Sequence, residues 1–215
     1  VAFEKLCSIA PNFRKAAENN EIEIWECDES IWHIALKAAK YDVPYMLWGG
    51  GIGTSIPELN NEIEKVVIKG KHYLKIPQIK IDASFLHCGF ADDQGNVQFP
   101  KNVFLGRIFC ERNLAEASKQ VVCSVEKIVG NSDIVKNAER TIIKNAFVVE
   151  AKFGAHPGAS NGFYVPDLEH YKEYAKLCST NNFGKYLDKY VFGCKSHDAY
   201  LKKIGKKRLN SLLLN

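Results

Sequence analysis

Strand-like and helix-like segments alternate along this chain, and that alternation limits the folds it can adopt. Polar and apolar residues alternate over residues 21–25, which predicts a strand. Asp28 can cap a helix whose apolar residues fall on one face and which ends near Asp42, because the Val43-Pro44 pair that follows resists helical geometry. The same patterns predict strands over residues 45–48, 81–88, 120–125 and 145–153, the first of them buried, and helices over residues 114–118, 167–177, 183–192 and 196–204.

Strands separated by helices predict an α/β fold with a mainly parallel sheet. The length of 215 residues suits one sizeable domain over residues 1–215, with residues 166–215 as a helical C-terminal extension. In open sheets of this kind, ligands bind beyond the carboxyl ends of the strands. The candidate site loops are therefore those that follow Trp48, Cys88, Val125 and Phe153.

Charge and cysteine content argue against several classes of protein. The formal net charge is +4, and the excess of lysine and arginine lies near residues 202–208. Such a run is more typical of a solvated helix face than of a nucleic-acid interface. The seven cysteines form no Cys-x-x-Cys pair and several lie in apolar runs, so we expect reduced thiols, no metal site and a cytoplasmic protein. No apolar run approaches the length of a membrane span, so no membrane partner is expected.

Four glycines, Gly49, Gly50, Gly51 and Gly53, follow the strand predicted over residues 45–48. Glycine at such a place lets the backbone approach a phosphate or another ligand closely. The spacing does not meet the Gly-x-Gly-x-x-Gly pattern, since position 54 is Thr, and it lacks the Gly-Lys-Ser/Thr of a P-loop. A ligand-binding loop and a purely structural turn both stay open, and a nucleotide-binding protein is a distant alternative.

Three further side chains are candidates for chemistry. His156, close to Gly154 in a tight loop, can hold a carboxylate or thioester oxygen, or can lock the loop by bonding a nearby carbonyl. His87 lies inside a predicted strand, the usual place of a core histidine. Glu29 falls in the first turn of its helix, where a carboxylate complements the helix dipole without any catalysis.

The Phe153-Gly154-Ala155-His156-Pro157 loop and the turn of Ala91-Asp92 with Gly95-Asn96 are the most specific motifs of the chain. Shorter segments accompany them at residues 10–16, 43–45, 53–54, Asp82 with His87, 97–98, 124–129, 162–164, 190–192 and 197–201. Taken in order, these segments resemble the A subunits of family I CoA-transferases of the glutaconate CoA-transferase type, and the likeness covers nearly the whole chain.

This resemblance implies a three-layer α/β/α fold of the CoA-transferase-like (NagB/RpiA/CoA transferase-like) class and an A₂B₂ assembly with a B subunit. It implies that CoA moves from an acyl-CoA to a free carboxylic acid, with the CoA thioester as substrate and no bound cofactor. The nucleophilic glutamate belongs to the B subunit, where it forms an acyl-glutamyl anhydride and then a glutamyl-CoA thioester. This chain is therefore expected to be inactive alone and to bind substrate through the glycine loop, His87, Gly154 and His156.

This chain departs from the family pattern in two ways, and these departures leave alternative functions open. Family A subunits carry a strand and a glycine-rich loop before the segment that matches residues 10–16, so an N-terminal βα portion is expected to be missing here. A neighbouring branch, which opens a ring in CoA-linked steroid-degradation intermediates, uses a glutamate that aligns with Glu29 and an arginine that aligns with Gly49. A ring-opening carbon–carbon hydrolase with Glu29 as its candidate catalytic residue is the second hypothesis, and a non-catalytic degenerate subunit is the third. The residues do not predict the acyl group.

Overall fold

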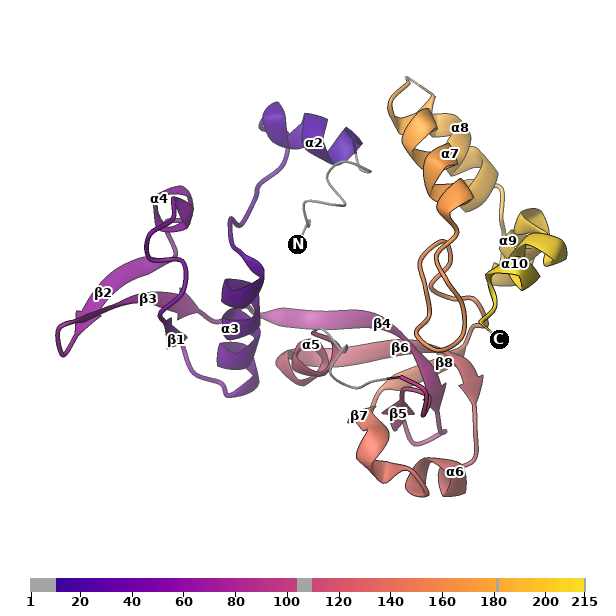
Figure 1. The fold of residues 1–215 in the computed structure, drawn as a ribbon, viewed down its shortest axis with the longest axis horizontal. Helices are drawn as coiled ribbons and strands as arrows, with labels where there is room; N and C mark the ends of the chain where they lie inside the picture. The colour runs from indigo at the N-terminus through magenta and orange to yellow at the C-terminus, as the bar shows by residue number, and fades with distance from the viewer. Residues whose placement is uncertain (1–10, 104–109, 181, 215) are drawn as a thin grey trace. The chain divides into compact units, whose positions relative to one another are not determined.

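The computed structural model describes residues 11–103, 110–180 and 182–214 (Figure 1). The chain divides into two compact units. The larger unit is Trp25–Glu150, and the smaller unit combines Val1–Ile24 with Ala151–Asn215. Each unit contains its own cluster of buried apolar side chains, and the single domain over residues 1–215 stays a prediction.

A three-stranded antiparallel sheet forms one part of the larger unit. Its strands lie in the order β1 (Tyr45–Trp48), β3 (Lys71–Pro77), β2 (Glu64–Ile68). Strands β2 and β3 form a hairpin, which the sequence patterns did not predict. Lys69 and Gly70 at its turn have φ angles of 50° and 75°, and two such left-handed residues match the twist of the strands on either side.

Helix α3 (Glu29–Lys40) packs against this sheet and confirms the helix predicted after Asp28. The Asp28 carboxylate accepts a hydrogen bond from the backbone nitrogen of Ile31 at 2.7 Å and so caps the first turn. Ile31 on the helix and Leu74 on β3 are both fully buried in the resulting core. The short helix α4 (Ile56–Leu59) lies between β1 and β2 in the chain.

The second sheet of the larger unit has five strands. Strands β4, β6 and β8 are adjacent and parallel, whereas β5 pairs in the antiparallel sense with both β4 and β7 (Figure 1). The fold is therefore α/β with a mixed, mostly parallel sheet. In spatial order the strands are β7 (Thr141–Ile143), β5 (Val97–Gln98), β4 (Ile81–Ala91), β6 (Ser118–Ile128) and β8 (Phe147–Glu150).

Helix α5 (Glu111–Ala117) contacts β4, β6 and β7 and also α3, to which it is joined by an ion pair of 2.7 Å between Lys40 and Glu116. On one face of the sheet, alternate residues of β4 and β6 contribute to the core. Cys88 and Cys123 are almost completely buried there, as the apolar runs around them predicted. After β6 the chain forms α6 (Asn131–Val135) and a 3₁₀ turn (Ala138–Arg140).

Two expectations for strands are wrong. Residues 21–25 belong to no strand, and Ile22 and Ile24 are exposed. Strand β1 exists but is not buried, because it lies at the edge of the antiparallel sheet with Tyr45 and Leu47 exposed. Alternation of polar and apolar residues describes the two faces of a segment, whereas a strand also needs a neighbour for its backbone hydrogen bonds.

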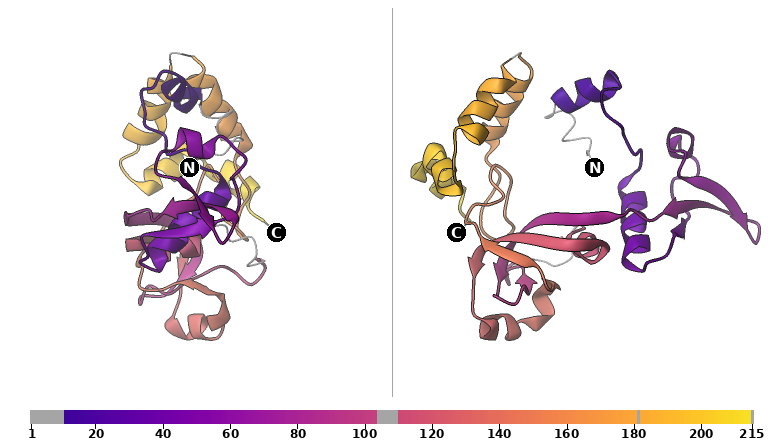
Figure 2. Two further views of the ribbon diagram at one scale, coloured as in Figure 1. Left: turned by 90° about the vertical axis from the view of Figure 1, so that its left-hand side faces the viewer. Right: turned by 180° about the vertical axis from the view of Figure 1, so that it is seen from behind.

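The smaller unit is helical, which confirms the helical C-terminal segment. Phe153, Tyr164, Tyr190 and Leu209 are among the buried residues of its core, and Figure 2 shows α7 to α10 (orange to yellow) gathered together. Across the described residues, no helix combines the length and the apolar character needed to cross a membrane. The helices are α2 (Pro11–Glu18), α7 (Leu168–Cys178), α8 (Phe183–Leu187), a π-helical turn (Asp188–Phe192), α9 (His197–Ile204) and α10 (Lys206–Leu212).

The turn at the end of β4 is organised by one buried carboxylate. Asp92 is fully buried and accepts hydrogen bonds from the backbone nitrogens of Gln94 (3.1 Å) and Asn96 (2.8 Å) and from the side-chain amides of Asn96 (2.9 Å) and Asn131 (2.8 Å). A Cβ at Gly95 would lie 2.4 Å from the carbonyl oxygen of Ala146, so this position tolerates no side chain. The Ala-Asp-x-x-Gly-Asn pattern is thus explained by packing alone.

We expect Asp92→Ala to lower the free energy of unfolding of the larger unit by about 3 kcal/mol, because the hydrogen-bond donors of Gln94, Asn96 and Asn131 lose the charged acceptor that holds the turn. Burial by itself would raise the pKa of Asp92, but hydrogen bonds from Asn96, Asn131 and Gln94 outweigh it and hold the pKa below its usual range. This stabilisation is present above the unfolded-state pKa and is lost as the pH falls through the folded-state pKa. Urea denaturation measures both effects, and the exposed Asp93→Ala is the control, expected to change stability by less than about 0.5 kcal/mol.

Candidate functional site

The residues predicted to form the site are divided between the two units. The convergence of the two sets into one pocket stays a prediction. Glu29, Gly49, Gly50, Gly51, Gly53 and His87 belong to the larger unit, and Gly154 and His156 belong to the smaller unit.

Three of the four predicted site loops are placed differently by the structure. The glycine loop after Trp48 does not lie at the carboxyl edge of the parallel strands, because β1 belongs to the other sheet. Strands β4 and β6 both continue past Cys88 and Val125, so these two positions lie inside strands. Residue patterns located the strands correctly but ended them too early, and the Asp92 turn takes the place at the edge instead.

The glycine loop packs against the first turn of α3. Trp48 at the end of β1 donates a hydrogen bond from Nε1 to the Ser30 hydroxyl at 3.0 Å. Gly51 has a φ of 80°, and a Cβ built there would lie 3.3 Å from the Cδ1 atom of Ile31. The exposed Glu29 therefore lies on the same helical turn against which the loop packs.

The four glycines are not equivalent. A Cβ at Gly50 would lie 2.6 Å from Nε1 of Trp48, and Gly51 has a backbone conformation that other residues rarely adopt. A Cβ at Gly49 or Gly53, in contrast, would meet nothing within 4 Å. Gly50 and Gly51 are therefore explained as structural, whereas Gly49 and Gly53 leave open space beside the backbone.

His87 lies between two partners on β6. Its Nε2 is 2.7 Å from Oε1 of Glu126, and its Nδ1 is 2.9 Å from the hydroxyl of Ser124. The register places His87 directly beside Ser124, and Glu126 follows two residues later on the same face. The sequence correctly placed His87 inside a strand. It did not predict Ser124 and Glu126 as its partners, because only the pairing of β4 with β6 brings them to His87.

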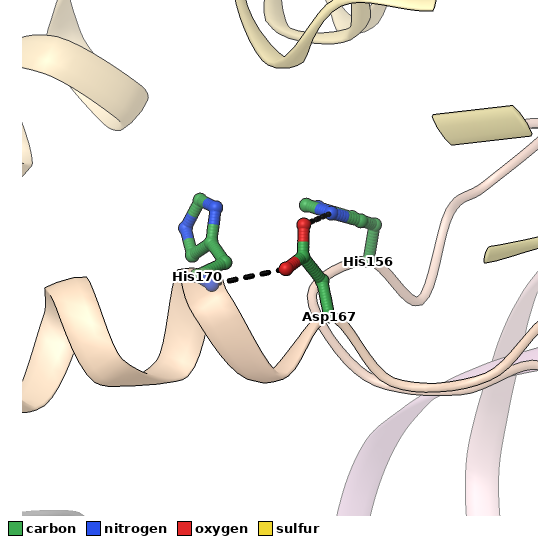
Figure 3. Close-up of side chains that lie close together, drawn as sticks. All are labelled: His156, Asp167 and His170. Atoms are coloured by element: carbon green, nitrogen blue, oxygen red, sulfur yellow. Dashed lines mark hydrogen bonds and ion pairs between the residues drawn. The ribbon is translucent and has the colours of Figure 1, made fainter. Parts of the chain in front are cut away.

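His156 is also held at both ring nitrogens, and Figure 3 shows the bond to Asp167. Its Nε2 lies 3.1 Å from Oδ2 of Asp167, and its Nδ1 lies 2.6 Å from the hydroxyl of Tyr200. Because a carboxylate can only accept, Nε2 carries the hydrogen and Nδ1 accepts from Tyr200. His156 thus ties its loop to α7 and α9. This agrees with the interpretation of a loop lock, although the partners are side chains rather than the carbonyl that we expected.

Asp167 is the centre of this network. Arg208 on α10 binds it with two hydrogen bonds, from Nε to Oδ2 at 2.5 Å and from a terminal nitrogen to Oδ1 at 2.7 Å. The backbone nitrogen of His170 donates to Oδ1 at 3.0 Å, so that Asp167 also caps α7. Although burial by itself would raise the pKa of Asp167, hydrogen bonds from Arg208, His170 and His156 hold it well below its usual range.

His156, Asp167 and His170 are of the residue types that bind metal ions, and their ligand atoms lie within 4.8 Å of one another. Both Asp167 oxygens are occupied by nitrogen donors, two of which belong to the cationic Arg208. A metal ion would have to displace that guanidinium and the His156 hydrogen bond. The geometry therefore favours a salt bridge that joins helices, and the expectation of no metal stays a prediction.

His170 is fully buried beside this network. Its Nε2 lies 2.8 Å from the hydroxyl of Tyr186, and its Nδ1 has no hydrogen-bond partner among the described residues. Burial, followed by the nearby His156, lowers the pKa of His170 to about 4. Burial likewise lowers the pKa of His156, against the opposing effect of Asp167. Both rings are therefore neutral at physiological pH.

Comparison with curated proteins finds relatives along almost the whole chain. The A subunit of glutaconate CoA-transferase from Acidaminococcus fermentans is 25% identical over 95% of this chain and 69% of its own length. The A subunit of 3-oxoadipate CoA-transferase from Pseudomonas knackmussii is 22% identical over 87% of this chain and 66% of its own length. The cholesterol ring-cleaving hydrolase IpdA subunit of Mycobacterium tuberculosis is 26% identical over 92% of this chain and 72% of its own length. No family model matches the chain.

Solved structures show the same fold. The crystal structure of glutaconate coenzyme A-transferase from Acidaminococcus fermentans superimposes with a TM-score of 0.84 at 23% identity, covering 96% of this chain and 70% of that one. The chain is a family I CoA-transferase A-subunit-like protein. A variant of the decarboxylase AibA/AibB matches this A-subunit-like chain with a TM-score of 0.68 at 21% identity, covering 82% of this chain and 64% of that one. Relatives of the A-subunit-like chain thus carry more than one activity.

Two residues of the A-subunit-like chain, Asp167 and Arg208, hold the loop of His156 but were absent from the site predicted from the sequence. Asp167 was read as the first residue of a helix, and Arg208 was read as part of a solvated basic run. The aspartate could have been found as a helix cap, whereas nothing in the local sequence signals that Arg208 reaches it across 41 positions of the chain.

We expect the smaller unit of the A-subunit-like chain to lose stability as the pH falls from about 6.5 towards about 4. His170 has its ordinary pKa of 6.5 in the unfolded chain and a pKa of about 4 when folded, so the unfolded chain binds more protons in this window. The loss amounts to about 2 kcal/mol between about pH 7 and about pH 5. Urea denaturation of the wild type and of His170→Phe measures it, and an equal pH dependence of both proteins would contradict the assignment.

Proposed function

We propose that this chain is the A subunit of a heteromeric CoA-transferase that moves CoA between an acyl-CoA and a free carboxylic acid. The nucleophilic glutamate is supplied by a B subunit, in an A₂B₂ heterotetramer of the cytoplasm. The single observation that carries this proposal is the likeness to glutaconate CoA-transferase, in sequence over 95% of the chain and in fold over 96% of it.

In this proposal the chain furnishes a wall of the pocket rather than the attacking group. The thioester carbonyl is attacked by the partner's glutamate, CoA leaves as a thiolate, and that thiolate then attacks the anhydride to give a glutamyl-CoA thioester and the first free acid. The second acid reverses these steps. The glycine loop, Glu29, His87 and the loop of Gly154 and His156 are the proposed wall, and the open space at Gly49 and Gly53 supports a close approach of substrate to that backbone.

A ring-opening carbon–carbon hydrolase is the second candidate. It is supported by the likeness to the IpdA subunit of the cholesterol ring-cleaving hydrolase and by the exposure of Glu29 on the helical turn against which the glycine loop packs. Gly49, which stands where that branch has an arginine, leaves the carboxylate without a cationic neighbour at that position. For this reason the transferase is the preferred function.

We expect the chain alone to transfer no CoA and the complex with a cognate B subunit to transfer it from acetyl-CoA to one or more members of a panel of carboxylic acids. Chromatographic separation of the acyl-CoA species measures the exchange. Sodium borohydride should inactivate the complex after acyl-CoA is added, because it reduces a glutamyl-CoA thioester on the B subunit.

If the complex transfers CoA to none of the acids and borohydride does not inactivate it, the transferase hypothesis is overturned. The hypothesis of a non-catalytic subunit would then remain. Consumption of a CoA thioester with a ring substituent when no acceptor acid is present would instead support the hydrolase. In that case Glu29→Gln should lower the rate by about a hundredfold, whereas Glu18→Gln, an exposed residue of the smaller unit, is the control and should leave the rate unchanged.

A further inference from the structure

One face of the parallel strands β4, β6 and β8 carries two rows of side chains. Alternate residues of a strand point to opposite faces, and Cys88, Cys123 and Val125 fill the core on the first face. The register of the three strands aligns the other face in rows across the sheet. One row is Phe85, Val122 and Phe147, and the next row is His87, Ser124 and Val149.

The first row is apolar and open to solvent. Phe85 is 77% exposed and Phe147 is 65% exposed, while Val149 at the end of the second row is 52% exposed. Large apolar side chains exposed side by side in this way are a common feature of binding surfaces. An apolar chain of a few carbons could lie along this row and bring a carbonyl group beside Ser124.

The second row places a hydroxyl, a base and a carboxylate in series. Ser124 Oγ is 2.9 Å from Nδ1 of His87, and Nε2 of His87 is 2.7 Å from Oε1 of the buried Glu126. An ionised Glu126 can only accept, so it holds the hydrogen on Nε2 and leaves Nδ1 as the acceptor for the serine hydroxyl. A nucleophile that is hydrogen-bonded to a base, which a third group orients, is the arrangement that activates a serine for acyl transfer.

The serine hydroxyl can also turn away from the imidazole. Its oxygen lies 3.3 Å from the carbonyl oxygen of Leu86, a second acceptor for its single hydrogen. After Ser124 has passed its proton to Nδ1 of His87, that Nδ1–H can donate back to the Ser124 oxygen, while Nε2–H still donates to Glu126. His87 can therefore hold the serine proton without losing either of its hydrogen bonds.

We propose that Ser124 accepts an acyl group from an activated ester or thioester with a short apolar acyl chain. The Ser124 oxygen attacks the acyl carbonyl carbon, and its proton passes to Nδ1 of His87. The bond from that carbon to the leaving oxygen or sulfur breaks, and the leaving group takes the proton from His87. The products are acyl-Ser124 and the free alcohol or thiol.

This step is separate from CoA transfer and needs no B subunit. The backbone around Ser124 is paired with β4 and β8 on both sides, so the strand amides are engaged in the sheet rather than aimed at a developing oxyanion. Without that stabilisation, the ester of Ser124 should form slowly and persist. The expected result is therefore stoichiometric acylation of the chain rather than turnover.

The test is to incubate the full chain with p-nitrophenyl acetate, follow release of p-nitrophenol, and map the acetyl group by peptide mass spectrometry. We expect acetylation of Ser124 up to one group per chain. Ser124→Ala should abolish that label, and His87→Gln, which keeps a polar side chain near Glu126, should slow labelling of Ser124 by about a hundredfold.

Ser84→Ala is the matched control. Ser84 lies on β4 and is buried, with an Oγ that has no hydrogen-bond partner in the described part of the chain, so its loss should change neither folding nor labelling. Far-ultraviolet circular dichroism confirms that each variant folds. Acetylation confined to lysines, or acetylation of Ser124 at an equal rate in His87→Gln, would overturn the proposal, whatever the outcome of the CoA-transfer assay with a B subunit.

Discussion

The parallel pairing of β4 with β6 determines the arrangement of the larger unit. Its register runs from Ile81 beside Ser118 to Ala91 beside Ile128, the full length of both strands. This pairing puts Cys88 and Cys123 into the core and His87 beside Ser124 on the opposite face. A slip by one residue would exchange the two faces and expose the core, so the apolar pattern of both strands holds the register. The Asp92 turn at the end of β4 and the helix α5 between the two strands then follow from it.

The smaller unit depends in the same way on one ion pair, in which the Asp167 carboxylate is buried and the Arg208 side chain is 33% exposed. Asp167 joins the start of α7 to the loop of His156, 11 residues away, and to Arg208 on α10, 41 residues away. Removing one partner of a buried, hydrogen-bonded charge pair costs more than the pair contributes, because the other charge is left unpaired. The Gly-Ala-His-Pro loop is therefore ordered by contacts with helices that follow it. This explains why its histidine has both nitrogens occupied by protein groups.

The likeness of the chain to transferases, to a ring-cleaving hydrolase and to a decarboxylase has a physical reason. One α/β scaffold can present different side chains from the same loops, so the fold is shared while the chemistry is decided by a few residues. In this chain Gly50 and Gly51 are needed by the turn itself, whereas Gly49 and Gly53 have room for a side chain. Differences between members of such a family are most easily accommodated at positions of the second kind.

Local patterns in the sequence were sufficient for features that depend on neighbours within a few residues. Helix α3 with its Asp28 cap, the strands β4 and β6, and the turn at Asp92 are of this kind, because capping, strand alternation and turn chemistry act over short distances. The order of several motifs along the chain was also enough to indicate the family. The strand expected over residues 21–25 failed because a strand needs a partner that the segment does not find.

Only the tertiary structure decided which distant residues meet. The pairing of His87 with Ser124 and Glu126 joins positions 37 and 39 residues apart, and Arg208 reaches Asp167 across 41 residues. Local propensity carries no information about such contacts, since they depend on strand register and helix packing. The sequence by itself therefore determined the α/β type of fold and about half of its elements, and the three-dimensional packing determined what each histidine touches and hence what it can do.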